Sequence, residues 1–170
     1  TLHWAAEKAR AAGDYEAAIH SWRSAIANDP GRAELCREFL ELLVEGDHKR
    51  QHLPSVWQNG SWLLRLNQTN HVDLEVIGRA FEYYQVEYQC IPLLSEEFES
   101  LTPHLRLLKL RALILQGRAL EFRQLWNQLP SQEQENREVE ILDIAYRSGW
   151  GSALSVDGAL DQLHEAMGSE

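Results

Sequence analysis

Two histidines, His48 and His52, stand four residues apart and directly follow Asp47. On a helix this spacing places both imidazole rings on one face, and such a pair can bind zinc. Lys49 and Arg50 lie between them, and the sequence offers no obvious third ligand nearby. The pattern is more typical of a solvated, charged turn between helices, so we expect no bound metal and no cofactor.

Three carboxylates, at Glu96, Glu97 and Glu99, are the next candidates for chemistry. Paired carboxylates can act as general acid and base. These three occupy a polar run with no histidine or glycine-rich loop beside it, which is typical of a solvated surface. The sequence also lacks the GxSxG, HExxH and P-loop patterns. We therefore expect that the chain is not an enzyme.

The two cysteines, Cys36 and Cys90, lie far apart in the sequence, and neither belongs to a CxxC or metal-ligand pattern. Free cysteine behaves as a small apolar side chain, so two buried thiols on helix faces are the favoured interpretation. A disulfide or a reactive thiol stays open as an alternative.

Composition narrows the class of partner. The chain has 170 residues, 44% of them hydrophobic, and a net charge of −10. Binding nucleic acid through its phosphates needs a basic surface, so this charge argues against a nucleic-acid partner. No apolar run reaches about 18 residues, so we expect no membrane insertion.

The clearest periodic element covers residues 13–30. Gly13 suits a turn with a left-handed backbone, and Asp29-Pro30 closes the segment. Between them the apolar residues recur at helical spacing: Tyr15, Ala18, Ile19, Trp22, Ala25 and Ile26. A preceding small-residue face, made by Ala5, Ala6, Ala9 and Ala12, predicts a partner helix before the turn.

Residues 13–30 resemble the second half of a tetratricopeptide repeat, and the resemblance is clearest over residues 2–32. One such repeat cannot bury its apolar face alone and must stack on neighbours. The resemblance therefore implies an all-α chain that forms a right-handed α-solenoid of about five antiparallel helix pairs. No long linker interrupts the sequence, so we expect a single domain over residues 1–170.

The second and third blocks depart from the repeat pattern. Asn59-Gly60 between two tryptophans is a hairpin signal, but we favour a helix here, with Pro54 at its start or at a break. In the third block, apolar residues between Tyr84 and Phe98 predict the second helix of the pair.

The last two blocks carry helix-start signals. Thr102 and Pro103 predict an N-cap followed by proline at the first helical position, and Gly117 predicts the break after that helix. Ser131 and Gln134 have the spacing of a capping box.

Charge alternates along the second half of the chain. Residues 71–103 hold seven acids and one base, residues 104–130 five bases and one acid, and residues 131–170 nine acids and two bases. One interpretation is that neighbouring repeats attract each other and so fix their stacking. The other is a basic pocket for an acidic peptide or an anionic ligand.

In the repeat family, the first helix of each pair lines a concave groove. By that resemblance the candidate partner-binding residues are Glu7, Arg37, Glu41, Glu75 and Arg79. Trp150, between two glycines, is a further candidate anchor, because tryptophan is favoured at interface hot spots. Members that clamp chaperone C-termini place asparagine where this chain has Glu7 and Glu41, so the groove suits a polar or basic segment better.

The sequence thus predicts a protein–protein interaction scaffold that binds a peptide or partner domain, in a compartment that the sequence leaves open. An alternative is a regulatory or targeting repeat segment of a larger enzyme, such as a glycosyl- or sulfo-transferring protein or a polysaccharide-assembly protein. The chain begins at Thr1 and not at methionine, which favours a processed protein or a piece of a longer one.

Overall fold

In the computed structural model of the chain, residues 2–66, 70–89 and 97–147 are described. These residues form α-helices and short 3-10 turns, with no strand among them, which confirms the predicted all-α class. The chain divides into two compact units, residues 1–84 and residues 85–170, and each is described by itself.

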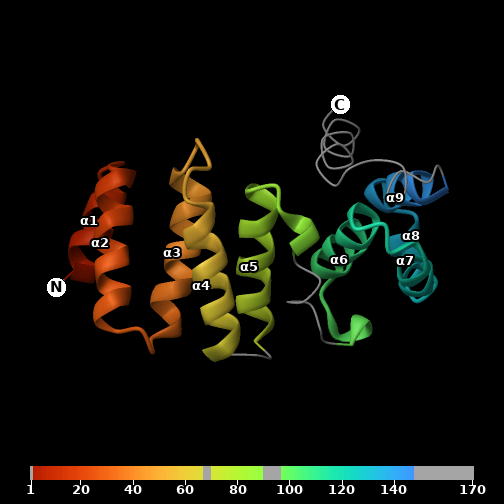
Figure 1. Cartoon of the computed structure of the whole chain (residues 1–170), viewed down its shortest axis with the longest axis horizontal. Helices are drawn as coiled ribbons and strands as arrows, with labels where there is room; N and C mark the ends of the chain where they lie inside the picture. Colours follow the sequence, from red (N-terminus) through yellow and green to blue (C-terminus); the bar gives the residue numbers. More distant parts are fainter. Residues whose placement is uncertain (1, 67–69, 90–96, 148–170) are drawn as a thin grey trace. The chain divides into compact units, whose positions relative to one another are not determined.

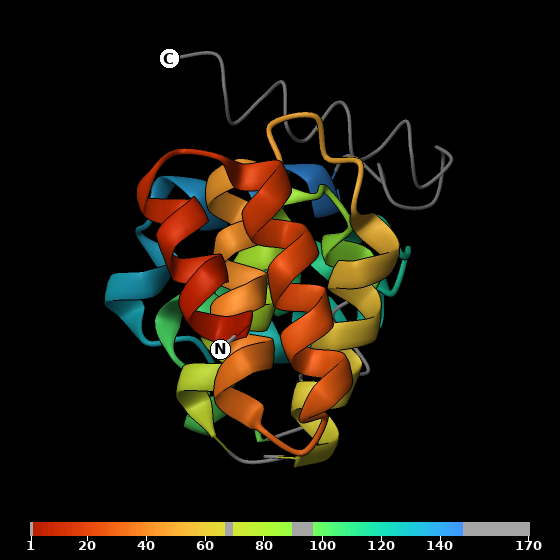
Figure 2. The same ribbon diagram turned by 90° about the vertical axis from the view of Figure 1, so that its left-hand side faces the viewer.

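The first unit consists of five helices in succession (Figure 1). They are α1 (Leu2–Ala11), α2 (Tyr15–Asn28), α3 (Ala33–Gly46), α4 (Leu53–Leu66) and α5 (His71–Tyr83). Each helix packs on the next one in the chain, and α5 also packs on α3. Figure 2 shows α1 and α2 side by side at the front of this unit, with α3 and α4 behind them.

Turn chemistry explains where these helices begin and end. Gly13 has a φ of 75°, a left-handed conformation that costs little without a Cβ atom, and Asp14 then caps α2 by accepting from the Ala17 N–H. Asn70 caps α5 in the same way through the Val72 N–H. Asn59 and Gly60 lie inside α4, so the favoured helix is confirmed and the hairpin alternative is wrong.

A continuous apolar interior fills the first unit. The large side chains of Trp22, Phe39 and Phe81 are fully buried, and so are the alanines at positions 6, 18 and 80. Small residues let neighbouring helices approach, and the aromatic rings fill the remaining space between them. The Trp22 stripe predicted from the sequence is therefore confirmed as core.

The second unit begins with two 3-10 turns, Glu87–Gln89 and Phe98–Ser100. Its helices are α6 (Pro103–Leu115), α7 (Ala119–Trp126), α8 (Ser131–Gln134) and α9 (Arg137–Arg147). The central helix, α6, packs on the first 3-10 turn, on α7 and on α9. It is buried over most of its length, which agrees with its nearly continuous apolar sequence.

The predicted start of α6 is confirmed. The Thr102 hydroxyl accepts from the Leu105 N–H, and Pro103 occupies the first helical position. The predicted break at Gly117 is also confirmed, since this residue has a φ of 69°.

Two local predictions fail in this unit. The stripe predicted for the second helix of the third block does not continue as helix through Tyr84 and Tyr88, because α5 ends at Tyr83 and a 3-10 turn follows at Glu87–Gln89. The part of the predicted helix around Pro92 lies outside the described residues. The capping box at Ser131 and Gln134 does not form, because Pro130 is the N-cap residue of α8. The Gln134 amide instead donates to the carbonyls of Trp126 and Leu129, which end the preceding helix.

Candidate interaction surface

Side-chain bridges join α1 to α3. His3 Nε2 lies 3.0 Å from a carboxylate oxygen of Glu38, and Arg10 Nε donates to Glu45 over 2.8 Å. In both bridges the two residues are 35 positions apart in the sequence. The two helices therefore lie in a fixed register, with a basic residue of α1 facing an acidic residue of α3.

A related bridge joins α3 to α5. Arg37 Nε donates to the fully buried Asp73 over 2.6 Å, at a separation of 36 residues. A neutral contact at the same separation runs from the Tyr83 hydroxyl to the backbone carbonyl of Asp47. Contacts between α3 and α5 thus repeat, one block later, the spacing of those between α1 and α3.

The sequence carries a charge repeat that the block-by-block reading missed. His3, Arg37 and His71 are 34 residues apart, and so are Glu7, Glu41 and Glu75. Comparing the chain with itself at this spacing would have revealed both series. The basic series supplies the His3 and Arg37 bridges, while the acidic series lies one helical turn further along each helix.

Glu7 and Glu41 are exposed, and neither makes a hydrogen bond or ion pair with the described residues. Both lie close enough to Arg10 to act on it electrostatically. Partial burial alone would lower the pKa of Arg10, but its hydrogen bond to Glu45 and the charges of Glu45, Glu7 and Glu41 raise it. Acidic groups therefore outnumber basic ones around Arg10.

The structure brings three of the predicted partner-binding residues together. Glu7, Arg37 and Glu41 lie on neighbouring turns of α1 and α3, and Glu41 acts electrostatically on Arg37 as it does on Arg10. Glu75 is half-buried on α5, and Arg79 is exposed one turn further on. No contact ties Arg79 to Glu41. Trp150 lies outside the described residues.

The two histidines of the candidate metal pair lie in a turn between helices, as the favoured interpretation predicted. His48 and His52 lie in the loop between α3 and α4, so helical spacing does not align their rings. His52 Nδ1 instead accepts from Arg23, and the His48 ring packs edge-on against Tyr15. Elsewhere, donor atoms of His3, Glu7 and Glu38 lie within 4.8 Å of one another. His3 is already bridged to Glu38 there, and its ring rests edge-on against Trp22.

A buried carboxylate, Asp47, holds the loop between α3 and α4. It accepts hydrogen bonds from the Tyr84 hydroxyl and from the His52 N–H. Burial alone would raise the pKa of Asp47, but these bonds, with one from the Gln51 N–H, lower it. The loop is therefore fastened to the end of α5 by an ionised group.

Cys36 is fully buried in α3. Burial, together with the nearby Asp73 charge, raises the pKa of its thiol to about 11. This agrees with the favoured interpretation of Cys36 as a structural thiol, whereas Cys90 lies outside the described residues.

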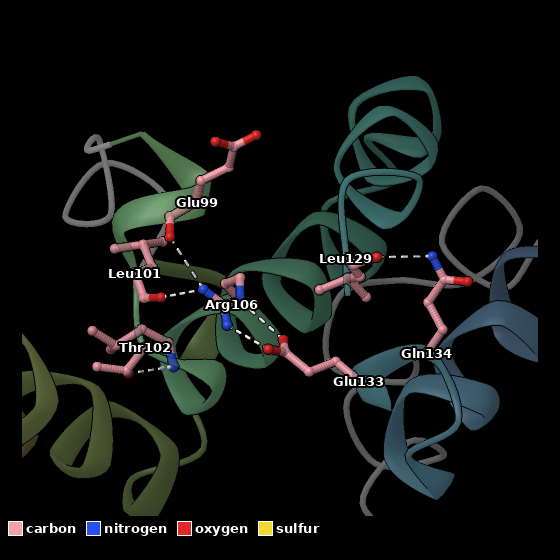
Figure 3. A network of polar contacts seen from close by, with 8 residues as sticks. Glu99, Leu101, Thr102, Arg106, Leu129, Glu133 and Gln134 are labelled. Atoms are coloured by element: carbon pink, nitrogen blue, oxygen red, sulfur yellow. Dashed lines mark hydrogen bonds and ion pairs between the residues drawn. The ribbon is translucent and has the colours of Figure 1, made fainter. Parts of the chain in front are cut away.

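In the second unit, the basic segment is largely neutralised by its acidic neighbours. Figure 3 shows Arg106 between the backbone carbonyls of Glu99 and Leu101 on one side and the Glu133 carboxylate on the other. Its Nε lies 2.9 Å from Glu133, in a two-pronged contact with that carboxylate.

Two further arginines repeat this arrangement. Arg111 donates to Glu87 over 2.9 Å, with both side chains buried, and Arg123 donates to Asp143 over 3.2 Å. Basic residues of the 104–130 segment thus bond to acids from both flanking acidic segments. These ion pairs agree with attraction between the oppositely charged segments, and these three arginines do not form a basic pocket.

No described helix is both long enough and apolar enough to cross a bilayer. In comparisons with known proteins, no family model, no curated protein and no solved structure matched the chain. The functional argument therefore rests on the surface itself.

Proposed function

We propose that the chain is a protein–protein interaction module of the tetratricopeptide-repeat kind. In this proposal the helices form antiparallel pairs that stack as a right-handed α-solenoid within a single domain. The support is the register of the first unit, where bridges between α1, α3 and α5 join residues 35 or 36 positions apart. That separation is close to the repeat length of about 34 residues in this family.

The proposed binding surface is the side of α1, α3 and α5 that carries Glu7, Arg37, Glu41 and Glu75. One observation carries the proposal: Arg10 and Arg37 are bridged to carboxylates, while Glu7 and Glu41 are exposed and make no hydrogen bond or ion pair with the described residues. α3 alone holds four acids and one base. An acidic surface with unbonded carboxylates complements a basic, extended segment of a partner protein.

The bridges also favour binding by fixing the surface beforehand. Arg10 and Arg37 are held by Glu45 and Asp73, so a partner does not have to order them. A preformed surface lowers the entropic cost of association. Exposed charge pairs are screened by salt, so affinity for a basic segment should fall as ionic strength rises.

A peptide titration of the full chain tests this proposal. A fluorescein-labelled peptide, Gly-Lys-Ala-Gly-Arg-Ala-Gly-Lys, and its Glu/Asp counterpart would be followed by fluorescence polarisation at low and high salt. We expect saturable, salt-sensitive binding of the basic peptide. The double variant Glu7→Gln with Glu41→Gln should weaken it about tenfold, the scale of two charge-assisted contacts of modest strength.

The matched control is Glu16→Gln with Glu135→Gln, which removes two exposed carboxylates from other elements. This control carries the same net charge as the double variant and should bind almost as the wild type does. Equal losses in both variants would mean that only net charge matters, and would overturn the proposed surface.

A further inference from the structure

A pocket lies in the first unit among α2, α3 and α4. It is a pocket of about 400 Å³, within the range of roughly 300–1,000 Å³ that is common for ligand sites. Its lining includes Arg23, Ile26, Phe39, Asn59 and Trp62. It shares no lining residue with the Glu7 and Glu41 surface, so it requires its own explanation.

Arg23, at one end of the pocket, has no carboxylate among its hydrogen-bond partners in the described residues. Its guanidinium donates to His52 Nδ1 over 2.9 Å and to Ser55 Oγ over 2.8 Å. Arg10 and Arg37, in contrast, each face a carboxylate. Arg23 is exposed, its guanidinium is held in position, and no carboxylate of the described residues bonds to it. Such a guanidinium can bond to a carboxylate of a partner protein.

The pocket interior is apolar and fixed. Ile26 and Pro30 contribute apolar surface above the buried Phe39, and the Trp62 indole is anchored by donating its N–H to the Pro30 carbonyl. Asn59 is buried, and its amide donates to the Ser55 carbonyl. The pocket therefore combines a preformed apolar space with a cation at its edge.

The surrounding charge favours an acidic occupant. α2 and α4 together hold one acid, Glu16, and two bases, Arg23 and Arg65, in a chain whose net charge is −10. The loop that leads into α4 adds the exposed Lys49 and Arg50. Asp14 and Asp29 flank α2, so the charge that favours an acidic occupant is that of Arg23 at the edge of the pocket.

We propose that this pocket docks an acidic segment of a partner protein that inserts one aromatic or large aliphatic side chain. The inserted side chain packs against Ile26 and Trp62, and a neighbouring carboxylate bonds to Arg23. Charge complementarity selects the segment and the apolar space supplies most of the affinity. The proposal is independent of the Glu7 and Glu41 surface, which selects the opposite charge.

Heteronuclear NMR of the full chain provides the test, because the Trp62 indole N–H is a resolved reporter inside the pocket. The probe is the peptide acetyl-Gly-Glu-Phe-Glu-Gly-amide, with two comparison peptides in which lysine replaces both glutamates or alanine replaces phenylalanine. We expect a saturable shift of the Trp62 indole signal, assigned through Trp62→Phe. Both comparison peptides should bind at least about tenfold more weakly.

Arg23→Gln should weaken the acidic peptide about tenfold, while Arg65→Gln, on the same helix as Trp62, should leave its affinity within about twofold. Arg23→Lys keeps the charge but loses the fork of donors, so an intermediate loss is expected. An unchanged backbone spectrum would show that each variant is folded. Equal binding of the lysine peptide, equal losses for Arg23→Gln and Arg65→Gln, or no shift at Trp62 at millimolar peptide would each overturn the proposal.

Discussion

The two units are both held together by polar side-chain contacts, but only in the first unit are the bonded residues separated by a nearly constant number of positions. Both join neighbouring elements through arginine–carboxylate contacts. In the first unit the side-chain bridges between helices span 35, 35 and 36 residues, whereas in the second the arginine–carboxylate contacts span 27, 24 and 20. The constant separation coincides with the clearest sequence resemblance to a repeat, which indicates that periodic charge accompanies periodic packing.

The units also differ in what their ion pairs leave accessible. In the Arg10–Glu45 pair the side chains are 28% and 41% exposed, whereas those of Arg111 and Glu87 are 3% and 0% exposed. An exposed pair contributes little to stability but can orient a surface. A buried pair costs desolvation and must stay intact for the fold. The Arg10–Glu45 pair therefore serves the surface of the first unit, whereas the Arg111–Glu87 pair belongs to the interior of the second.

The largest expected loss of stability comes from Trp22→Ala in the first unit. Trp22 is fully buried between helices, so its removal should lower the free energy of unfolding by about 3–5 kcal/mol. Urea denaturation followed by circular dichroism would measure the change. A loss under about 1 kcal/mol would mean that the helix register of this unit is wrong.

Breaking the buried pair of the second unit should cost about as much. Arg111→Met leaves the Glu87 carboxylate buried without this cation and should destabilise by about 3–5 kcal/mol. Replacing both residues, by Glu87→Leu with Arg111→Met, should recover most of that loss. The matched change at an exposed pair, Arg10→Met, should cost about 1 kcal/mol or less. Similar losses for the two arginines, by the same denaturation assay, would remove the distinction between the units.

Alanine substitutions at two glycines, Gly46 and Gly60, test how closely the helices of the first unit pack at these positions. A Cβ atom at Gly46 would lie 2.2 Å from the Tyr15 ring, whereas one at Gly60 would meet Ile77 and Phe81 at an ordinary 3.5 Å. Gly46→Ala should therefore destabilise by about 1–3 kcal/mol, the range of an overpacked core. Gly60→Ala should be neutral or stabilise by up to about 1 kcal/mol, since alanine is the better helix former. Thermal unfolding of the two variants would measure the change in stability. A larger loss of stability for Gly60→Ala than for Gly46→Ala would contradict the close packing of Tyr15 on α3.

The smallest effect concerns pH. Hydrogen bonds from Tyr84 and the loop backbone lower the pKa of Asp47 despite its burial, so its ionised form stabilises the fold. That stabilisation is present above the unfolded-state pKa of about 3.9 and is lost as pH falls through the lower folded-state pKa. Asp47→Asn should cost about 1–3 kcal/mol at pH 7 and reduce the decline of stability below about pH 5. An unchanged acid profile in denaturation experiments would mean that Asp47 is not held as described.

Local signals predicted the fold wherever a few neighbouring residues decide the structure. Gly13, Thr102 with Pro103, and Gly117 act within one turn of the chain, and each behaves as predicted. Gln134 does not, because its amide bonds to carbonyls at the end of α7, and competition between two such partners cannot be judged from spacing alone. His48 and His52 lie in the predicted turn between helices, but the bond from Arg23 to the His52 ring joins residues 29 positions apart and could not be read from local spacing.

The candidate surface was predicted only in part. Glu7, Arg37 and Glu41 come together as expected, because they occupy equivalent turns of helices in a constant register. The Arg23 pocket had no sequence signal, since its lining comes from three helices and a loop and shares no period. Periodic surfaces can thus be read from one sequence, whereas pockets formed between helices require the packed structure.

Mapping the basic peptide on the full chain by heteronuclear NMR tests the central claim most directly. If the first unit binds through its regular surface, shifts should concentrate on α1, α3 and α5 and leave α6 to α9 unchanged. They should also be lost in the Glu7→Gln with Glu41→Gln variant. Shifts confined to residues 103–147, or shifts that the double variant retains, would contradict the account.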